Sequence, residues 1–539
     1  MSPNHSRSPA TSTGHAGASD EAILHRLGYA QVLYREMGGF SNFAISFTII
    51  SILSGCLNSY YIGFWYGGPV AITWGWLLVG VFCVLVALAL GEIASSMPTA
   101  GALYFWASKL GGAAWGWFTG WFNLIGQIAV TAAIGYGCAV FTTALLNLLW
   151  DYPNSTSWVL FTYGMILFLA GLVNMFKVSA TAMLNAFSAW WHMIGVLIIV
   201  GILIVVPDDH KSVGYVFTET LNNTGFSGDS WGSFMFIYVF ITGLIMAQYT
   251  ITGFDASAHM SEETRKASLA AAWGMVMAVV VSVIFGFILL VAVTFAIPGL
   301  SNDDLVGAGQ GIVTLIWTES TSTRWAEFML FIVVVAQTFC TIASVTSASR
   351  MMFAFSRDGA VPGHKLWRRV SKADRVPVYA VWGICVLSFA LMIPTLSNAF
   401  VGYAVGTQIS VIGLYIAFIL PVILRLKAGS SFQQGAWNLG RYYKLVDWAA
   451  IIWVAFIAIA FVLPFASTGV PGNEGFTWDF FNYTGPLVGA AFILFGGWYV
   501  LSARKWFKGP VVQGTEEELE RIEREYEPGR PAPTVSPAK

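Results

Sequence analysis

Ionisable side chains are rare within the long apolar runs of this chain, and three of them could bind a proton or a charged ligand. A charged side chain at the bilayer centre costs about 2.5–3.5 kcal/mol on insertion scales, so we expect it to face a cavity or a partner. Asp255 is therefore predicted to contact a bound ammonium group or to carry a proton. His192 titrates near neutral pH and is a candidate proton carrier, with a neutral, hydrogen-bonded packing role as the alternative. Glu92 is predicted to anchor a loop.

Two of the apolar runs carry helix-weakening residues in their middles. Residues 51–59 read SILSGCLNS and residues 249–257 read YTITGFDAS. Glycine lacks a Cβ, and short polar side chains compete for backbone hydrogen bonds, so both segments are predicted to unwind. A helix N-terminus inside a membrane attracts a carboxylate, and freed carbonyl groups attract an ammonium group or a cation. The alternative for each segment is a small-residue face for helix packing.

Long apolar runs must position these groups. The chain has 539 residues, of which 56% are apolar and 10% charged, whereas about 25% are charged in a typical soluble domain. Each run is long enough to cross a hydrocarbon core of about 30 Å. We therefore predict an all-α membrane protein with about twelve transmembrane helices, near residues 39–62, 69–96, 113–149, 157–176, 183–206, 232–257, 268–297, 325–354, 377–397, 400–424, 446–466 and 484–503.

The distribution of positive charge predicts the orientation. With both termini inside, all but two of the 27 Lys and Arg residues fall in tails, inside loops or inner helix ends; the exceptions are Lys211 and Arg324. This asymmetry follows the positive-inside rule and predicts a multi-pass protein of the cell membrane with cytoplasmic termini. The largest inside cluster comprises Arg350, Arg357, Lys365, Arg368, Arg369, Lys372 and Arg375.

The spacing of the weakened segments predicts internal symmetry. They lie in the first and sixth spans, and an odd separation of five makes the second enter from the opposite side, as in an inverted five-helix repeat. We predict a first repeat at 39–206 (helices 1–5), a second at 232–424 (helices 6–10) and two extra helices at 446–505. Residues 1–38 and 506–539 are then cytoplasmic tails.

The C-terminal tail divides into two parts. Residues 515–526 are predicted to form a short charged helix with Thr515 as its N-cap, and residues 528–539 to be disordered. A solvated tail is favoured over one that binds a regulatory partner.

Several classes of function are disfavoured. A net charge of −1 argues against nucleic-acid binding. The five cysteines lie in apolar runs without metal-ligand spacing, so we predict no metal site and no cofactor. Catalytic motifs such as HExxH or a P-loop are absent from the sequence, which argues against an enzyme.

Several segments resemble the amino acid–polyamine–organocation (APC) superfamily over residues 27–505, most closely its amino acid/choline (γ-aminobutyrate/choline permease-like) branch. They are LGYAQVLYR at 27–35 followed by FSNFA at 40–44, GEI at 91–93 with PTAGALY at 98–104, GFDAS at 253–257 with SEET at 261–264, and SRMMFAFSRDG at 349–359. The resemblance implies a LeuT-like fold of two inverted five-helix repeats plus two helices, with helices 1 and 6 broken. It also implies a secondary transporter that works by alternating access on amino acids or related small amines.

The resemblance also implies which residues bind substrate. Backbone groups of both broken helices would hold its amino and carboxyl groups, which places Ser51, Ser54, Gly55, Thr252, Gly253 and Phe254 there, with Tyr249 as an aromatic gate. His192 falls where some proton-coupled relatives carry Lys, so His192 and Asp255 are the candidates for proton coupling.

The coupling and the substrate stay open at this point. Proton symport is favoured; the alternatives are sodium symport using Ser344 and Ser347 of helix 8, exchange of amino acids or amines, or a nutrient receptor on a transporter scaffold. The candidate substrates are amino acids, γ-aminobutyrate, choline and polyamines. The expected partners are therefore a small molecule, a coupling ion and the lipid bilayer, and the oligomeric state is not predicted.

Overall fold

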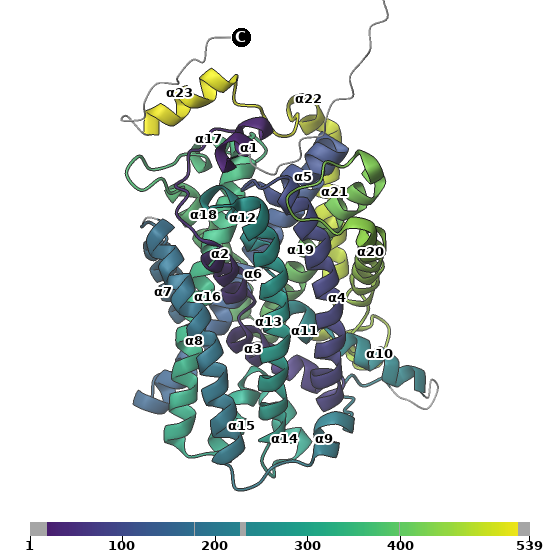
Figure 1. Ribbon diagram of the computed structural model, residues 1–539. Helices are drawn as coiled ribbons and strands as arrows, with labels where there is room; N and C mark the ends of the chain where they lie inside the picture. Colours follow the sequence, from purple (N-terminus) through teal and green to yellow (C-terminus); the bar gives the residue numbers. More distant parts are fainter. Residues whose placement is uncertain (1–18, 177, 227–232, 398, 527–539) are drawn as a thin grey trace, which may run out of the picture.

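Membrane-spanning helices make up the body of the protein (Figure 1). The computed structural model describes residues 19–176, 178–226, 233–397 and 399–526, and the regular elements within these ranges are helices. Eleven helices are long and apolar enough to cross a membrane, and a shorter apolar helical stretch, Phe234–Thr250, completes the twelve. Helices satisfy their own backbone hydrogen bonds, which a bilayer requires. The all-helical fold with twelve spans is confirmed.

The spans follow one another in chain order and correspond to the twelve predicted runs. They are α2 (Gly39–Ile50) with α3 (Ile52–Trp65), α4 (Gly68–Ser96), α6 (Ala113–Trp150), α7 (Thr156–Val173), α8 (Val178–Val205), α10 (Ser233–Gly243) with α11 (Ile245–Thr250) and α12 (Ala256–His259), α13 (Ala267–Phe295), α16 (Thr323–Arg357), α18 (Val378–Met392), α19 (Ala399–Ala428), α20 (Tyr443–Ala460) and α21 (Thr484–Trp498). The ninth and tenth spans, predicted with almost no loop between them, are joined by a 3-10 turn at Ile393–Leu396.

Short helices lie between the spans and in the two tails. Most of them were not predicted from the sequence, because they are brief. They are α1 (Asp20–Leu27), α5 (Ala102–Gly111), α9 (Val213–Thr218), α14 (Asn302–Gly307), α15 (Ile312–Ser320), α17 (His364–Trp367), α22 (Arg504–Trp506) and α23 (Glu516–Tyr526).

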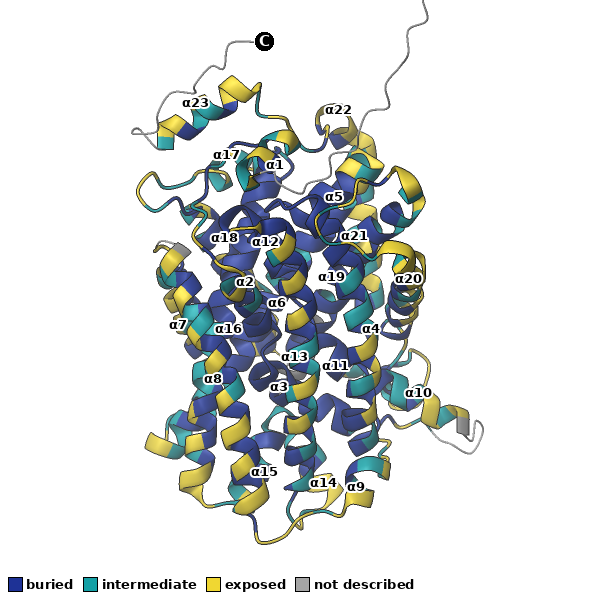
Figure 2. Ribbon diagram, in the orientation of Figure 1, coloured by how far each residue is buried: buried dark blue, intermediate teal, exposed yellow. Residues whose placement is uncertain are grey.

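The interior is built from the spans that carry the candidate site. In the most apolar stretches of Gly39–Trp65 and Ala113–Trp150, 83% of residues are buried, against 11% in Thr484–Trp506. Figure 2 shows this contrast as dark blue central helices surrounded by outer helices with yellow faces. The outer apolar faces are the surface that lipid covers. The five cysteines are buried and free, as expected for small apolar packing residues.

Helices five spans apart pack against each other. α4 contacts α13, and α6 contacts α16. Counted as spans, these are the pairs 2–7 and 3–8. The first and sixth spans also meet, because α3 packs on α11 and α2 on α12.

Glu92 anchors a loop, as predicted. Its carboxylate accepts a hydrogen bond from Arg425 Nε at 2.9 Å and another from the backbone N–H of Leu439 at 3.2 Å. Both charged side chains are buried. The pair ties the second span to the tenth and to the connection that follows it.

The prediction that the C-terminal tail is solvated is wrong. α23 forms where a charged helix was predicted, but it docks on the N-terminal segment, at the end of the bundle where α1 lies (Figure 1). Glu523 is 1% exposed; it contacts His25 Nε2 at 2.8 Å and accepts the backbone N–H of Gln31 at 2.6 Å. Leu519 packs with Ala30 and Val32. Buried apolar and ionic contacts therefore hold the tail in place.

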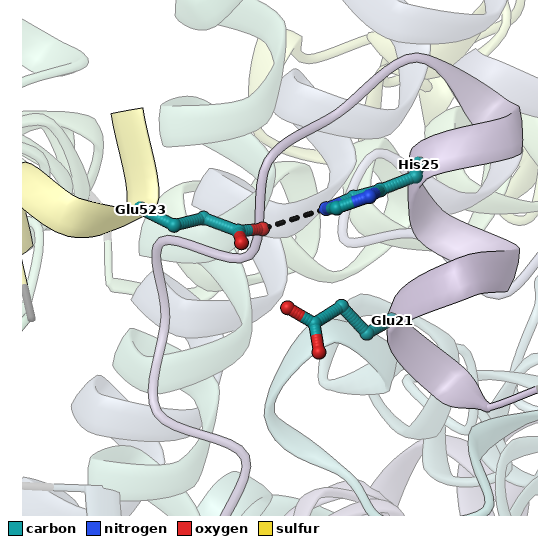
Figure 3. A group of neighbouring side chains, drawn as sticks. All are labelled: Glu21, His25 and Glu523. Atoms are coloured by element: carbon teal, nitrogen blue, oxygen red, sulfur yellow. Dashed lines mark hydrogen bonds and ion pairs between the residues drawn. The ribbon is translucent and has the colours of Figure 1, made fainter. Parts of the chain in front are cut away.

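The contact between the two tails is shown in Figure 3. Glu21 and His25 project from α1 toward Glu523 of α23. A ring nitrogen of His25 and one carboxylate oxygen from each glutamate lie within 4.8 Å of one another. At the start of α23, Glu518 Oε2 accepts the backbone N–H of Thr515 at 2.8 Å. Glutamate three residues after an N-cap residue typically makes this bond. The predicted disordered segment 528–539 lies outside the described residues.

Candidate substrate and proton site

The first span breaks at a single residue. Ser51 adopts φ +38°, in the left-handed region, and separates α2 from α3. Its N–H bonds the carbonyl of Phe47, and its own carbonyl accepts the N–H groups of Ser54 and Gly55, both at 2.7 Å. The unwound stretch is therefore shorter than the predicted 51–59, because this carbonyl restarts the helix at once and places Ser54 and Gly55 within α3.

The sixth span unwinds over five residues, 251–255, between α11 and α12. Gly253 has φ +89°, which an L side chain rarely adopts. Side chains from other spans satisfy the freed carbonyl groups: Tyr415 donates to that of Ile251 at 2.6 Å, and Ser46 to that of Phe254 at 2.7 Å. The predicted unwinding of this segment is confirmed.

Two glycines let the broken helices touch. A Cβ on Gly253 would lie 2.4 Å from Ile49 Cγ2, and a Cβ on Gly55 would lie 2.5 Å from Thr250 Cγ2. Both separations are too short for real carbon atoms. The structure thus brings together the predicted substrate residues of the two helices, namely Ser51, Ser54, Gly55, Thr252, Gly253 and Phe254, and the side chains of the non-glycine members are at most 2% exposed. The site is closed to solvent.

His192 lies against the break in the first span. Its Nδ1 is 2.8 Å from the carbonyl oxygen of Ser188, and its Nε2 is 2.7 Å from the hydroxyl of Ser51. A carbonyl only accepts, so Nδ1 carries a hydrogen; Nε2 can then accept from the Ser51 hydroxyl. A neutral imidazole satisfies both contacts.

Asp255 and His259 form a buried pair whose side chains can share a proton. His259 Nδ1 is 2.9 Å from the carbonyl oxygen of Ala100 and must donate to it. Its Nε2 lies 3.2 Å from Asp255 Oδ2, and both side chains are fully buried. With a hydrogen only on Nδ1, two lone pairs would face each other. A second hydrogen, on Nε2 or on the carboxyl group, would make this contact a hydrogen bond.

Two side-chain amides from the third span also contact the Asp255 carboxylate. Gln127 donates to Asp255 Oδ2 at 2.9 Å, and Asn123 lies 3.4 Å from the same oxygen. Among the described residues, Asp255 Oδ1 has no hydrogen-bond partner. The sequence analysis missed His259, Gln127 and Asn123. His259 alone had a signal, since it follows Asp255 by four residues and thus lies on the same helical face.

Tyr249 lies among aromatic residues. It is 4% exposed, and its hydroxyl interacts with that of Tyr403, which also lies close to Tyr136. Tyr61 approaches the same group. The predicted gate residue is thus one of four buried tyrosines contributed by different spans.

The serines of the alternative sodium site lie on α16. Both Ser344 and Ser347 are buried, and neither hydroxyl has a hydrogen-bond partner among the described residues. One turn before Ser344, the thiol of Cys340 donates to the carbonyl oxygen of Ile49 in the first span at 3.3 Å. This face of α16 therefore adjoins the broken helix.

Buried ion pairs close the end of the bundle that carries the tails. Arg350 Nε bonds Glu263 at 2.9 Å, and Arg357 binds Glu262 with both terminal nitrogens. Asp358 accepts hydrogen bonds from the hydroxyls of Tyr29 and Tyr104. Burial raises the pKa of Asp358, and the neighbouring Arg357 lowers it.

Twelve spans, two of them broken and in contact with each other, define the scaffold of a polytopic membrane protein. The chain belongs to the amino acid permease family of the APC superfamily, whose profile matches residues 37–493. It is 37% identical to the amino-acid permease BAT1 homolog of Oryza sativa subsp. japonica and 36% identical to amino-acid permease BAT1 of Arabidopsis thaliana, each over 92% of this chain and 96% of the relative. It is 24% identical to a putative polyamine transporter of Candida albicans, over 97% of this chain and 94% of that one.

Proposed function

We propose that this permease is a proton-coupled symporter of an amino acid or a related small amine. The observation that carries the proposal is the buried Asp255–His259 pair, whose side chains are close enough to share a proton. Asp255 borders the unwound segment that would bind substrate. Binding of the proton would neutralise the buried Asp255 carboxylate or charge the His259 imidazole. Because this charge change would occur next to the substrate, proton binding and substrate binding would be coupled.

The substrate would lie between the two breaks. The N-terminus of α3, at Ser51–Ser54, carries positive dipole charge that suits a carboxylate. Asp255 Oδ1, which has no hydrogen-bond partner among the described residues, suits an ammonium group. Tyr249 would cover the site. This arrangement accepts amino acids and zwitterions such as γ-aminobutyrate; choline or a polyamine would use the cationic half alone.

Alternating access would use internal symmetry. The 2–7 and 3–8 helix contacts support inverted repeats at 39–206 and 232–424, with 446–505 as added helices. By the positive-inside rule, the end that carries α1, α17 and α23 would be cytoplasmic, because its described loops hold cations such as Lys365, Arg368 and Arg369. The protein would lie in the plasma membrane. Opening toward the cytoplasm would then break the pairs of Arg350 with Glu263 and of Arg357 with Glu262.

Sodium symport is the second candidate, because the unpartnered hydroxyls of Ser344 and Ser347 beside the first span suit a cation. Exchange without a coupling ion and a receptor role are the remaining alternatives. Transport of labelled compounds into proteoliposomes separates all four. The panel comprises amino acids, γ-aminobutyrate, choline and polyamines, and the gradients are an inward proton gradient, an inward sodium gradient or preloaded substrate. Proton-driven uptake supports the proposal; uptake driven only by sodium, or only by preloaded substrate, or binding without uptake, rejects it.

His192 is expected to organise the substrate site rather than to carry the coupled proton. His192→Gln should keep proton-driven uptake and raise KM about tenfold, since losing a buried hydrogen bond costs roughly 1–3 kcal/mol. KM and the proton dependence of uptake are measured together. Uptake that no longer responds to the proton gradient would instead place the coupled proton on His192.

A further inference from the structure

A basic cavity lies at the tail-bearing end of the molecule, outside the substrate site. It has a volume of about 990 Å³ and lies between the segment around α17, the start of α18 and the docked C-terminal helix α23. In Figure 1, α17 and α23 lie close together at this end. The cavity is large enough for a polar headgroup, because pockets for small ligands span about 300–1,000 Å³.

Three cations line the cavity without acidic partners. Lys365, Arg368 and Arg369 are exposed, and within the described ranges no carboxylate lies within ion-pair distance of them. The acidic residues of α23 that form ion pairs do so elsewhere, Glu523 with His25 and Glu520 with Arg524. The fourth lining cation, Arg357, is already bound to Glu262. Three positive charges therefore face the cavity.

His364, next to Lys365, lies in the same positive electrostatic potential. The pKa of His364 lies below its ordinary value because of partial desolvation and because Arg368 and Lys365 disfavour a further positive charge. An anion in the cavity would relieve this repulsion.

The remaining wall connects the cavity to the membrane. Val378 and Tyr379 belong to the first turn of α18, which is a membrane-spanning helix, and Tyr379 is 47% exposed beneath Arg369. Half-exposed tyrosine at a span end is typical of the membrane interface. Ile522 and Tyr526 of α23 supply the opposite apolar wall. A ligand with an anionic head and an apolar body matches this lining.

We propose that the cavity binds the headgroup of an anionic glycerophospholipid from the adjacent leaflet. The phosphate contacts Lys365, Arg368 and Arg369, and the glycerol and first acyl carbons lie along Val378 and Tyr379. Because α23 forms one wall, the bound lipid also holds the C-terminal helix against the bundle.

Binding of fluorescent dioctanoyl phosphatidylglycerol to the detergent-purified full chain tests the proposal. Dioctanoyl phosphatidylcholine is the zwitterionic comparison and glycerol phosphate the soluble one. The triple variant Lys365→Gln, Arg368→Gln, Arg369→Gln should bind phosphatidylglycerol about 100-fold more weakly, since each basic side chain near anionic lipid contributes about 1 kcal/mol. The matched control, Arg504→Gln, Lys505→Gln, Lys508→Gln, removes three exposed cations next to the twelfth span.

The proposal predicts tight binding of phosphatidylglycerol, weak binding of the other two compounds, and loss of binding only in the first triple variant. Equal binding of phosphatidylcholine, or equal loss in both variants, would overturn it. Glycerol phosphate binding as tightly as the lipid would reassign the cavity to a soluble anion. Size-exclusion profiles and melting temperatures of both variants establish that each is folded.

Discussion

Asp255→Asn is expected to abolish proton-driven accumulation of substrate while retaining exchange, because the asparagine Oδ1 can still accept a hydrogen bond from the substrate's ammonium group. Asparagine keeps the shape of aspartate and can still bond Gln127, but it cannot take up a proton. At a membrane potential of about 100 mV, one positive charge moving inward supplies about 2.3 kcal/mol, or roughly 50-fold accumulation of a neutral zwitterion. The accumulation ratio should therefore fall from about 50 to about 1. Uptake against a gradient and counterflow of preloaded substrate are measured in the same proteoliposomes.

His259→Gln should give the same result, because the proton is shared across the contact of 3.2 Å between Nε2 and Oδ2. The control is His210→Gln, a loop histidine whose Nε2 contacts the carbonyl oxygen of Leu203. Normal accumulation in Asp255→Asn would show that the coupled proton lies elsewhere. Loss of counterflow together with accumulation would assign Asp255 to substrate binding alone.

Gly253→Ala is expected to reduce transport at least 100-fold without unfolding the protein. The added methyl would lie 2.4 Å from Ile49 Cγ2, and the residue would have to hold φ +89°. The left-handed conformation alone costs an L residue roughly 1–2 kcal/mol, and overpacking typically adds 1–3 kcal/mol. Relief of this strain would push the two broken helices apart where substrate binds. Substrate affinity and transport rate are both measured.

A matched glycine separates the effect of the clash with Ile49 from the effect of the left-handed backbone conformation. Gly472 has φ +96° but nothing within 4 Å of its Cβ position, so Gly472→Ala should leave transport unchanged. The double variant Gly253→Ala, Ile49→Ala removes the clashing carbon and should recover part of the activity. Wild-type transport in Gly253→Ala would contradict close contact between the two helices at this position.

The spans and the break in the sixth helix were predictable because each depends on local sequence. Twelve long apolar runs cannot all be exposed to water, so they predict membrane spans. Gly253 lies among short polar residues within one of these runs, which predicts a break in the helix. The length of the first break was not predictable. Ser51 is a serine in a left-handed conformation, and nothing about its residue type distinguishes it from Ser54 or Ser59.

Contacts between segments that are distant in the chain could not be predicted from the sequence. The environment of His259 depends on the carbonyl of Ala100, which is 159 residues away in the chain. The docking of α23 depends on Glu523 meeting His25, 498 residues away. A charged C-terminal segment has the composition of a solvated tail, and only the burial of Leu519 and Glu523 reveals that it is part of the folded body.

Proton entry on addition of substrate is the most direct test of the central claim. Proteoliposomes containing a trapped pH-sensitive dye, with the membrane potential clamped and sodium absent, are exposed to the transported compound. The account predicts that the lumen acidifies in step with uptake in the wild-type protein, and that Asp255→Asn exchanges substrate without acidification. Substrate uptake with no change in luminal pH, or uptake that requires sodium, would contradict proton coupling at the Asp255–His259 pair.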